Sequence, residues 1–195
     1  MIGRTTVDPM TQIKALSVLQ TIELVRKKHD ETTIEQIKAA LSRPARQAIY
    51  EAPLLPSDWV DVRYVTENLV AFDALCGGAD GQAAKALVRE LAEAQISGVY
   101  RLLFAIVSPR SLVDKAGRLW PRYYDRGESI GKMQGGTSAT FQILGCPDLP
   151  KHHDWIVLPY TEVALSHAGA KTVTSRHSQC VADGAQSCIS EFHWT

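Results

Sequence analysis

Residues 171–195 read KTVTSRHSQCVADGAQSCISEFHWT. The pair Asp183-Gly184 lies near the middle of this stretch and is a tight-turn signal, because aspartate and glycine tolerate the backbone angles that a short turn needs. The runs on either side, 171–180 and 187–194, are of strand length and rich in β-branched and aromatic residues. The stretch therefore predicts a terminal β-hairpin.

The two arms of this hairpin carry the groups that bind metals. His177 and Cys180 lie on the first arm and Cys188 lies at the start of the second, so the hairpin brings them close together. Two sulfur ligands and an imidazole suit zinc. A fourth ligand must come from elsewhere, and the run His152-His153-Asp154 offers one. The alternative is that the cysteines are free and pack as small apolar side chains.

The rest of the second half predicts a sheet with one helix. Short runs at 129–134 and 137–144 flank Gly135-Gly136 and predict another hairpin. Residues 155–168 predict a helix that ends at Gly169. The order after Gly127 is therefore ββαββ, which favours an antiparallel sheet over alternating βαβ units.

The first half has the apolar spacing of helices. We expect helices over these ranges: 13–28, 32–41, about 44–50, 66–75, from Asp80 as the capping residue through about Phe104, and 108–126. The predicted fold class is α+β, with a helical N-terminal half packed on an antiparallel C-terminal half. We expect a single domain over 1–195, with the helical part at about 10–126 and the sheet part at about 128–195, because each part is too small to bury its apolar face alone.

Composition excludes several classes of protein. Apolar residues make up 45% of the 195 residues and charged residues 22%, as in an ordinary soluble domain. The formal net charge is zero, which argues against a nucleic-acid binder that relies on bulk positive charge. No apolar run reaches membrane-spanning length, and the first residues lack the apolar block of a signal peptide. We expect a cytoplasmic protein without a membrane partner, whose four cysteines are thiols or metal ligands.

Two further stretches carry a family resemblance. Residues 54–59 read LLPSDW and residues 119–127 read LWPRYYDRG. Together they resemble a myxobacterial paralogous family of unknown function, over most of the chain. The second half also resembles the vinyl-reductase-type small-molecule-binding domain, which belongs to a superfamily with haem–nitric-oxide-binding domains and vesicle-tethering subunits. The resemblance implies a bacterial ligand-binding or sensory domain with a role in signalling.

The resemblance also implies a metal site. Sensor members of the superfamily hold zinc at a terminal hairpin, and Cys180 and Cys188 match their two hairpin cysteines. His177 stands where those members have glutamate, and Asp154 falls where they have a cysteine at the start of the preceding helix. The implied set is Asp154, His177, Cys180 and Cys188 around a structural zinc. Haem is not expected, because the haem branch needs a histidine on a mid-chain helix and this chain has none between His29 and His152.

Aromatic residues suggest where a ligand would lie. Trp120 and Tyr123, with Tyr124 beside them, lie at the end of a predicted helix, and Phe141 lies on a predicted strand. A small apolar molecule between helices and sheet would contact these four residues. The alternative is that they are ordinary core residues, since an aromatic stripe at helical spacing is more often core.

Three functions follow from these patterns. We favour a non-enzymatic small-molecule-binding or sensory domain, because no set of residues has the context of a catalytic site. The second is a protein-interaction scaffold of the same fold, including a homodimer, with no ligand or metal. The third is a metal-dependent hydrolase that uses His153 and Asp154.

Overall fold

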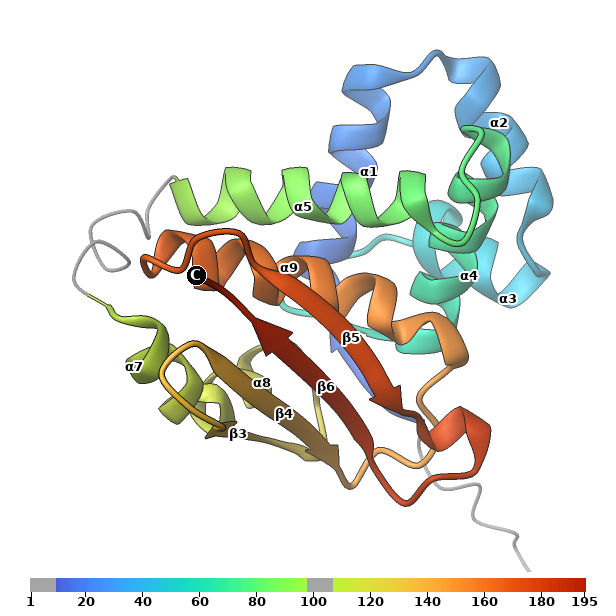
Figure 1. Cartoon of the computed structure of the whole chain (residues 1–195). Helices are drawn as coiled ribbons and strands as arrows, with labels where there is room; N and C mark the ends of the chain where they lie inside the picture. Colours follow the sequence, from blue (N-terminus) through green and yellow to red (C-terminus); the bar gives the residue numbers. More distant parts are fainter. Residues whose placement is uncertain (1–9, 98–106) are drawn as a thin grey trace, which may run out of the picture.

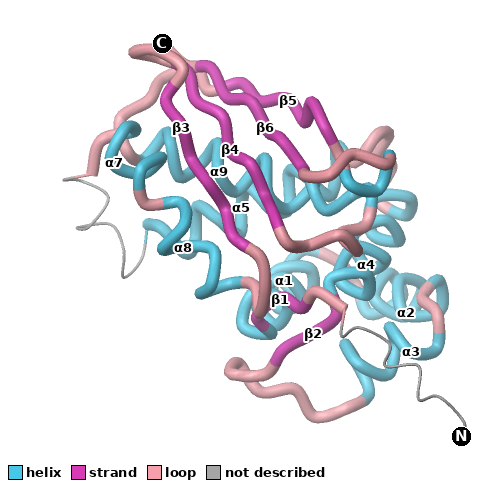
Figure 2. The backbone as a smooth tube through the Cα atoms, turned by 90° about the horizontal axis from the view of Figure 1, so that it is seen from below, coloured by secondary structure: helices cyan, strands magenta, loops and turns pink. Residues whose placement is uncertain are grey.

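A computed structural model describes residues 10–97 and 107–195. A layer of helices lies on one face of an antiparallel sheet (Figure 1). Viewed from below, the strands lie in front of the helices and no helix among the described residues covers their outer face (Figure 2). This arrangement confirms the α+β class, with a helical N-terminal half and a sheet in the C-terminal half.

The helical half contains most of the predicted helices. The elements are β1 (Gln12–Lys14), α1 (Ala15–Lys28), α2 (Glu31–Ala40), α3 (Arg43–Arg46), the π-helix η1 (Gln47–Glu51), β2 (Trp59–Asp61), α4 (Val62–Leu75), α5 (Gln82–Ser97), α7 (Pro109–Asp114) and α8 (Ala116–Tyr123). Asp30 caps α2 by accepting a hydrogen bond from the amide of Thr33, and Ser42 caps α3. The predicted continuation of α5 to about Phe104 lies outside the described residues.

Helix α4 begins at Val62 rather than at Thr66, and two further helix predictions also differ from the structure. Asp80 has a φ of 54° and does not cap α5. The carboxylate of Asp73, on α4, accepts hydrogen bonds from the amides of Gly81 and Ala84 instead. The helix predicted over 108–126 is two helices, because the chain leaves the helical conformation at Lys115, where φ is −97° and ψ is 0°. At the start of α5 a tertiary contact therefore replaces the local capping signal.

The C-terminal half has the predicted ββαββ order. Its elements are β3 (Glu128–Met133), β4 (Ser138–Leu144), the short 3₁₀ turn η2 (Lys151–His153), α9 (Asp154–His167), β5 (Thr174–Gln179), the 3₁₀ turn η3 (Val181–Asp183) and β6 (Cys188–His193). The antiparallel strand order is β3-β4-β6-β5, so β6 returns to pair with β4. Buried residues alternate along β4 and β6, and the helices cover that face.

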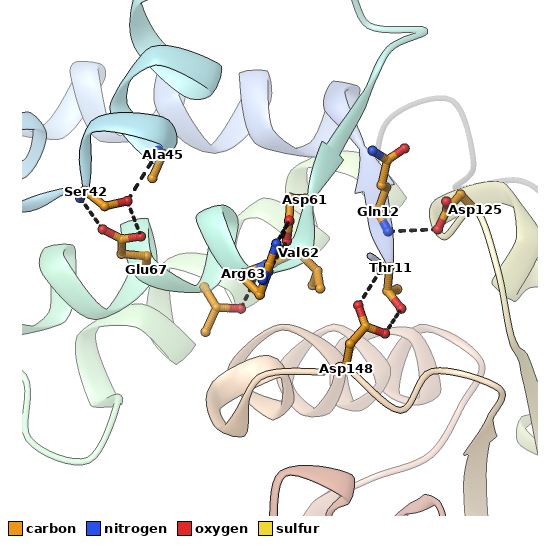
Figure 3. Close-up of polar contacts among 11 residues, drawn as sticks. Thr11, Gln12, Ser42, Ala45, Asp61, Val62, Arg63, Glu67, Asp125 and Asp148 are labelled. Carbon is orange, nitrogen blue, oxygen red and sulfur yellow. Dashed lines mark hydrogen bonds and ion pairs between the residues drawn. The ribbon is translucent and has the colours of Figure 1, made fainter. Parts of the chain in front are cut away.

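A small second sheet, which the sequence did not predict, joins the two halves. Strands β1 and β2 pair antiparallel, Thr11 donates two hydrogen bonds to the Asp148 carboxylate, and the amide of Gln12 donates to Asp125 (Figure 3). Thr11 is fully buried. These contacts attach the start of the helical half to the loops around the sheet.

The core has no sharp border between the halves. One apolar cluster joins α5, α7 and α9 to β4 and β6, and contains Ile96, Phe141, Leu165 and Phe192. A second cluster joins β1, α1 and α8 to the three buried cysteines of the sheet half. None of the helices in 10–97 and 107–195 is both long and apolar enough to cross a membrane.

Candidate functional site

Three metal-binding side chains meet where the terminal hairpin contacts the start of α9. His177 lies on β5, Cys188 begins β6, and His153 ends η2 directly before α9. The hairpin pairs His177 with Ser190 and then shifts register before Gln179. The turn η3 ends at Gly184, whose φ is 91°. Lys151 on η2 forms an ion pair of 3.3 Å with Asp183 on η3, so the two segments are held together beside the site.

The three donors converge in a nearly closed space. Ligand atoms of His153, His177 and Cys188 all lie within 4.8 Å of one another. The two imidazole rings are nearly perpendicular, with centroids 4.9 Å apart. His153 is 2% exposed and Cys188 is 1% exposed. Nitrogen and sulfur donors at this spacing form a potential site for a divalent transition-metal ion.

A hydrogen bond fixes which nitrogen of the His153 ring is free. Nδ1 of His153 lies 2.8 Å from the carbonyl oxygen of Pro150. A carbonyl can only accept, so Nδ1 carries the proton and Nε2 has a free lone pair. Burial lowers the pKa of His153 to about 4, which keeps the ring neutral at physiological pH. This is the protonation state and the carbonyl contact that a metal-binding histidine needs.

A carboxylate approaches the other side of the His177 ring. A carboxylate oxygen of Asp154 lies 3.8 Å from Nδ1 of His177. Nε2 of His177 is buried and has no hydrogen-bond partner among the described residues. A buried nitrogen without a partner is costly unless something binds it. The pairing of Asp154 with Nδ1 leaves Nε2 as the atom that would bind a metal ion.

The thiols of Cys180 and Cys188 adjoin each other at this site. Burial raises the pKa of Cys188 to about 12, and the neighbouring thiol of Cys180 contributes in the same direction. The amide of Val181 donates to the sulfur of Cys188 over 3.4 Å. The Cys188 thiol is therefore protonated when no cation is near. A bound metal ion would displace the proton, because a coordinating thiol binds as thiolate.

The predicted ligands are thus only partly gathered. The structure brings His177 and Cys188 together and places Cys180 beside Cys188. Asp154 approaches the opposite ring nitrogen of His177, and His153 stands in the position that the resemblance gave to Asp154. The sequence indicated that the run His152-His153-Asp154 supplies a ligand. Spacing alone could not select which of the three residues it is.

The four aromatic residues predicted to contact a ligand do not share one cavity wall. Trp120 and Tyr124 stack on each other, with ring centroids 3.9 Å apart, and both are buried. Phe141 belongs to the other cluster and packs edge-on against Phe192. Two hollows lie elsewhere, one along α2 beside Glu31 and Glu35 and the other between α2 and η1 beside Arg46 and Tyr50.

Tyr123 begins a chain of polar side chains that crosses four helices. Its hydroxyl lies 3.2 Å from that of Tyr160 on α9, which donates to the side chain of Gln95 on α5 over 2.9 Å. Gln95 in turn donates to Gln20 on α1 over 2.7 Å. All four side chains are half-buried. The chain joins α8 and α9 to α5 and α1, so a ligand bound there would contact both halves.

Comparison with known proteins identifies the fold. No family model and no curated protein matches the sequence. Solved structures of similar fold include an H-NOX protein from S. oneidensis in the Fe(II)NO ligation state, at 11% identity and a TM-score of 0.68, covering 93% of this chain and 99% of that one. An unliganded Fe(II) H-NOX A71G mutant from K. algicida matches at 10% identity and a TM-score of 0.64, covering 93% of this chain and 96% of that one. The chain has an H-NOX-like fold, as the superfamily resemblance implied; its link to the myxobacterial family stays a prediction.

The prediction that haem is not expected is contradicted by this finding. Two further matching structures concern haem. One addresses haem redox potential modulated by porphyrin distortion and is 12% identical to this chain; the other addresses haem distortion in the H-NOX family and is 13% identical. Proteins of this fold thus include haem-binding ones, and a missing mid-chain histidine was too narrow a criterion. No comparison names zinc, so the choice of zinc has no support.

The described residues offer few donors to a haem iron. The core cluster between α5, α7, α9 and the sheet is formed by apolar residues. The histidines on these elements are His167, which contacts Glu93; His177, which belongs to the candidate metal site; and His193, which is exposed. Met133 and Tyr160 lie at the margin of the cluster, and both residue types bind haem iron in other proteins. These two residues do not fit a histidine-ligated haem, so the described part of the chain supports no chemistry at a haem iron.

Proposed function

We propose that this chain is a non-enzymatic, ligand-binding sensor domain that works as a single unit. The observation that carries the proposal is the match of 93% of the chain to H-NOX domains, including one in its Fe(II)NO state. The polar chain from Tyr123 to Gln20 supports it, because a ligand there would change hydrogen bonds in both halves at once. A small, largely apolar molecule with one hydrogen-bonding group suits the half-buried Tyr123 and Tyr160 hydroxyls.

Binding of two probes tests this proposal. We would titrate the full chain with ferrous haem, followed by its absorption spectrum, and with phenol, followed by protein-observed NMR. We expect saturable binding of one probe at about one molecule per chain, weakened at least about fivefold in Tyr123→Phe if the hydroxyl contacts the ligand. The matched control is Tyr64→Phe, a half-buried tyrosine outside the chain of polar side chains. Failure of both probes to saturate would overturn the proposal and favour the scaffold alternative.

We further propose that His153, His177 and Cys188, together with Cys180, hold one transition-metal ion. The ion would join the β5–β6 hairpin to the start of α9, and Asp154 would orient His177. The unpartnered, buried Nε2 of His177 supports this assignment. The structure gathers three of these donors, and Cys180 beside Cys188 would supply the fourth. Four protein ligands would leave no open position for a catalytic water, which agrees with a structural role and disfavours the hydrolase.

Titration with Co²⁺ tests the metal site by a signal other than activity. We expect a thiolate-to-cobalt absorption band that saturates at about one ion per chain in the wild type. Cys188→Ser should abolish the band, and Cys76→Ser should retain it, because Cys76 contacts His29 far from the hairpin. Absence of the band in the wild type, or its loss in Cys76→Ser, would contradict the assignment.

A further inference from the structure

The positive charge of this neutral chain is concentrated on one stretch. Residues 107–133 contain six lysines and arginines but three acidic residues, a net charge of +3, whereas the whole chain has a formal net charge of zero. The stretch forms α7, α8 and the edge strand β3. These three elements lie side by side at one margin of the molecule (Figure 2).

Most cations of this stretch have no acidic partner. Five of them are exposed and form no ion pair or side-chain hydrogen bond with other described residues; we call them the basic ridge: Arg110, Lys115, Arg118, Arg122 and Lys132. Elsewhere cations are commonly paired, as in Lys28 with Glu90, Arg89 with Glu162 and Arg176 with Glu191. The ridge is therefore a local departure from the pairing in the rest of the fold.

The spacing on α8 places these charges on one side of the helix. Arg118 and Arg122 are four residues apart on α8, which aligns them along one face, and Lys115 directly precedes the helix. Ala116 and Trp120 are buried on the other face. Like charges at this spacing repel each other across successive turns of the helix. An anionic partner would relieve that repulsion.

We propose that the basic ridge is a docking surface for an acidic segment of a partner protein, in particular a helix with carboxylates on successive turns. Three of its five cations are arginines, whose planar guanidinium groups bind carboxylates with two parallel hydrogen bonds. Exposed positions at Gly117 and Pro121 lie between them and leave room for a helix. The partner would thus contact α8 along its length.

Two acidic residues favour a protein partner over nucleic acid. Asp114 and Glu128 are both exposed, and they lie on the same elements as the ridge. They would repel a uniform polyanion such as a phosphate backbone. A peptide can place its carboxylates opposite the cations and neutral residues opposite Asp114 and Glu128. The zero net charge of the chain also gives little long-range attraction for nucleic acid.

A labelled peptide tests the surface. The probe is a helical peptide of about 18 residues with glutamates at three- and four-residue spacing, measured by fluorescence anisotropy against the full chain at about 50 and 200 mM NaCl. We expect saturable binding that weakens with salt and is at least about tenfold weaker in Arg118→Glu/Arg122→Glu. The matched control Lys27→Glu/Lys28→Glu makes the same charge change at exposed, paired cations and should weaken binding less than about threefold.

Three results would contradict the proposal that the basic ridge is a docking surface. They are no saturable binding of the peptide, an equal loss in ridge and control variants, and tighter, ridge-dependent binding of a single-stranded oligonucleotide of about 20 nucleotides. Circular dichroism of each variant checks that the fold is retained. The docking proposal is separate from the ligand and metal proposals, because none of the five ridge cations is assigned to either site. Failure of the peptide to bind would therefore leave the sensor proposal intact.

Discussion

Replacement of Asp73 by asparagine should destabilise the protein by about 3 kcal/mol. The side chain is 5% exposed, and its two carboxylate oxygens accept from the amides of Gly81, at 3.1 Å, and Ala84, at 3.0 Å. Asparagine keeps only one acceptor oxygen, so one buried amide loses its partner at a cost of about 1–3 kcal/mol. Loss of the negative charge at the start of α5 adds roughly 0.3–1 kcal/mol.

Thermal and urea unfolding measure this effect. For a chain of this length, about 3 kcal/mol corresponds to a fall in Tm of roughly 6–12 °C. The matched control is Asp80→Gly, at the residue that the sequence suggested as the cap. Asp80 has a φ of 54°, which glycine adopts freely, so we expect a change within about 0.5 kcal/mol. An Asp73→Asn protein as stable as the wild type, or an Asp80→Gly protein that is the less stable of the two, would refute the role of Asp73 at the start of α5.

Two further substitutions test the packing between the halves. Burial acts to raise the pKa of Asp148, but the hydrogen bonds from Thr11 outweigh this effect and hold the pKa below its ordinary value. The stabilisation from these hydrogen bonds is therefore present above about pH 4 and is lost as the pH falls further. Thr11→Val should therefore cost about 1 kcal/mol at pH 7 and move the midpoint of acid unfolding to higher pH; an unchanged midpoint would contradict the role of Thr11. Gly131→Ala would place a Cβ atom 2.2 Å from the carbonyl oxygen of Val113 and should cost roughly 2 kcal/mol in urea unfolding, whereas Gly136→Ala, with no atom within 4 Å, should cost little. Equal stabilities of these two variants would argue against close packing of α7 on β3.

The sequence predicted the elements whose signals are local. The terminal hairpin was found from a turn dipeptide between strand-like runs, and α1 from its apolar spacing. Strands β1 and β2 have three residues each and were missed, because such short segments have no periodicity to detect. They exist through pairing with each other and through the contact of Thr11 with Asp148, which lies 137 residues away.

In the candidate site, too, the part with a local sequence signal was predicted and the part that depends on long-range contacts was not. The hairpin spacing was enough to place His177 beside Cys188. The identity of the third donor depends on which side chain faces the hairpin where η2 continues into α9. A shift of one residue would place Asp154 there instead of His153. The burial of His153 against His177 of the hairpin, 24 residues further along the chain, accompanies the observed arrangement and has no local signal in the sequence. The haem prediction failed for a different reason, because it relied on one missing residue where the whole fold was informative.

The metal content of purified variants tests the central claim about this site most directly. Each protein would be purified without metal-chelating resin and analysed for bound transition metals. We expect about one ion per chain in the wild type, loss of the ion in His153→Ala, and retention in His152→Ala, because His152 packs against Trp155 outside the donor group. Retention of the ion in His153→Ala together with its loss in His152→Ala, or no metal in the wild type, would contradict the claim.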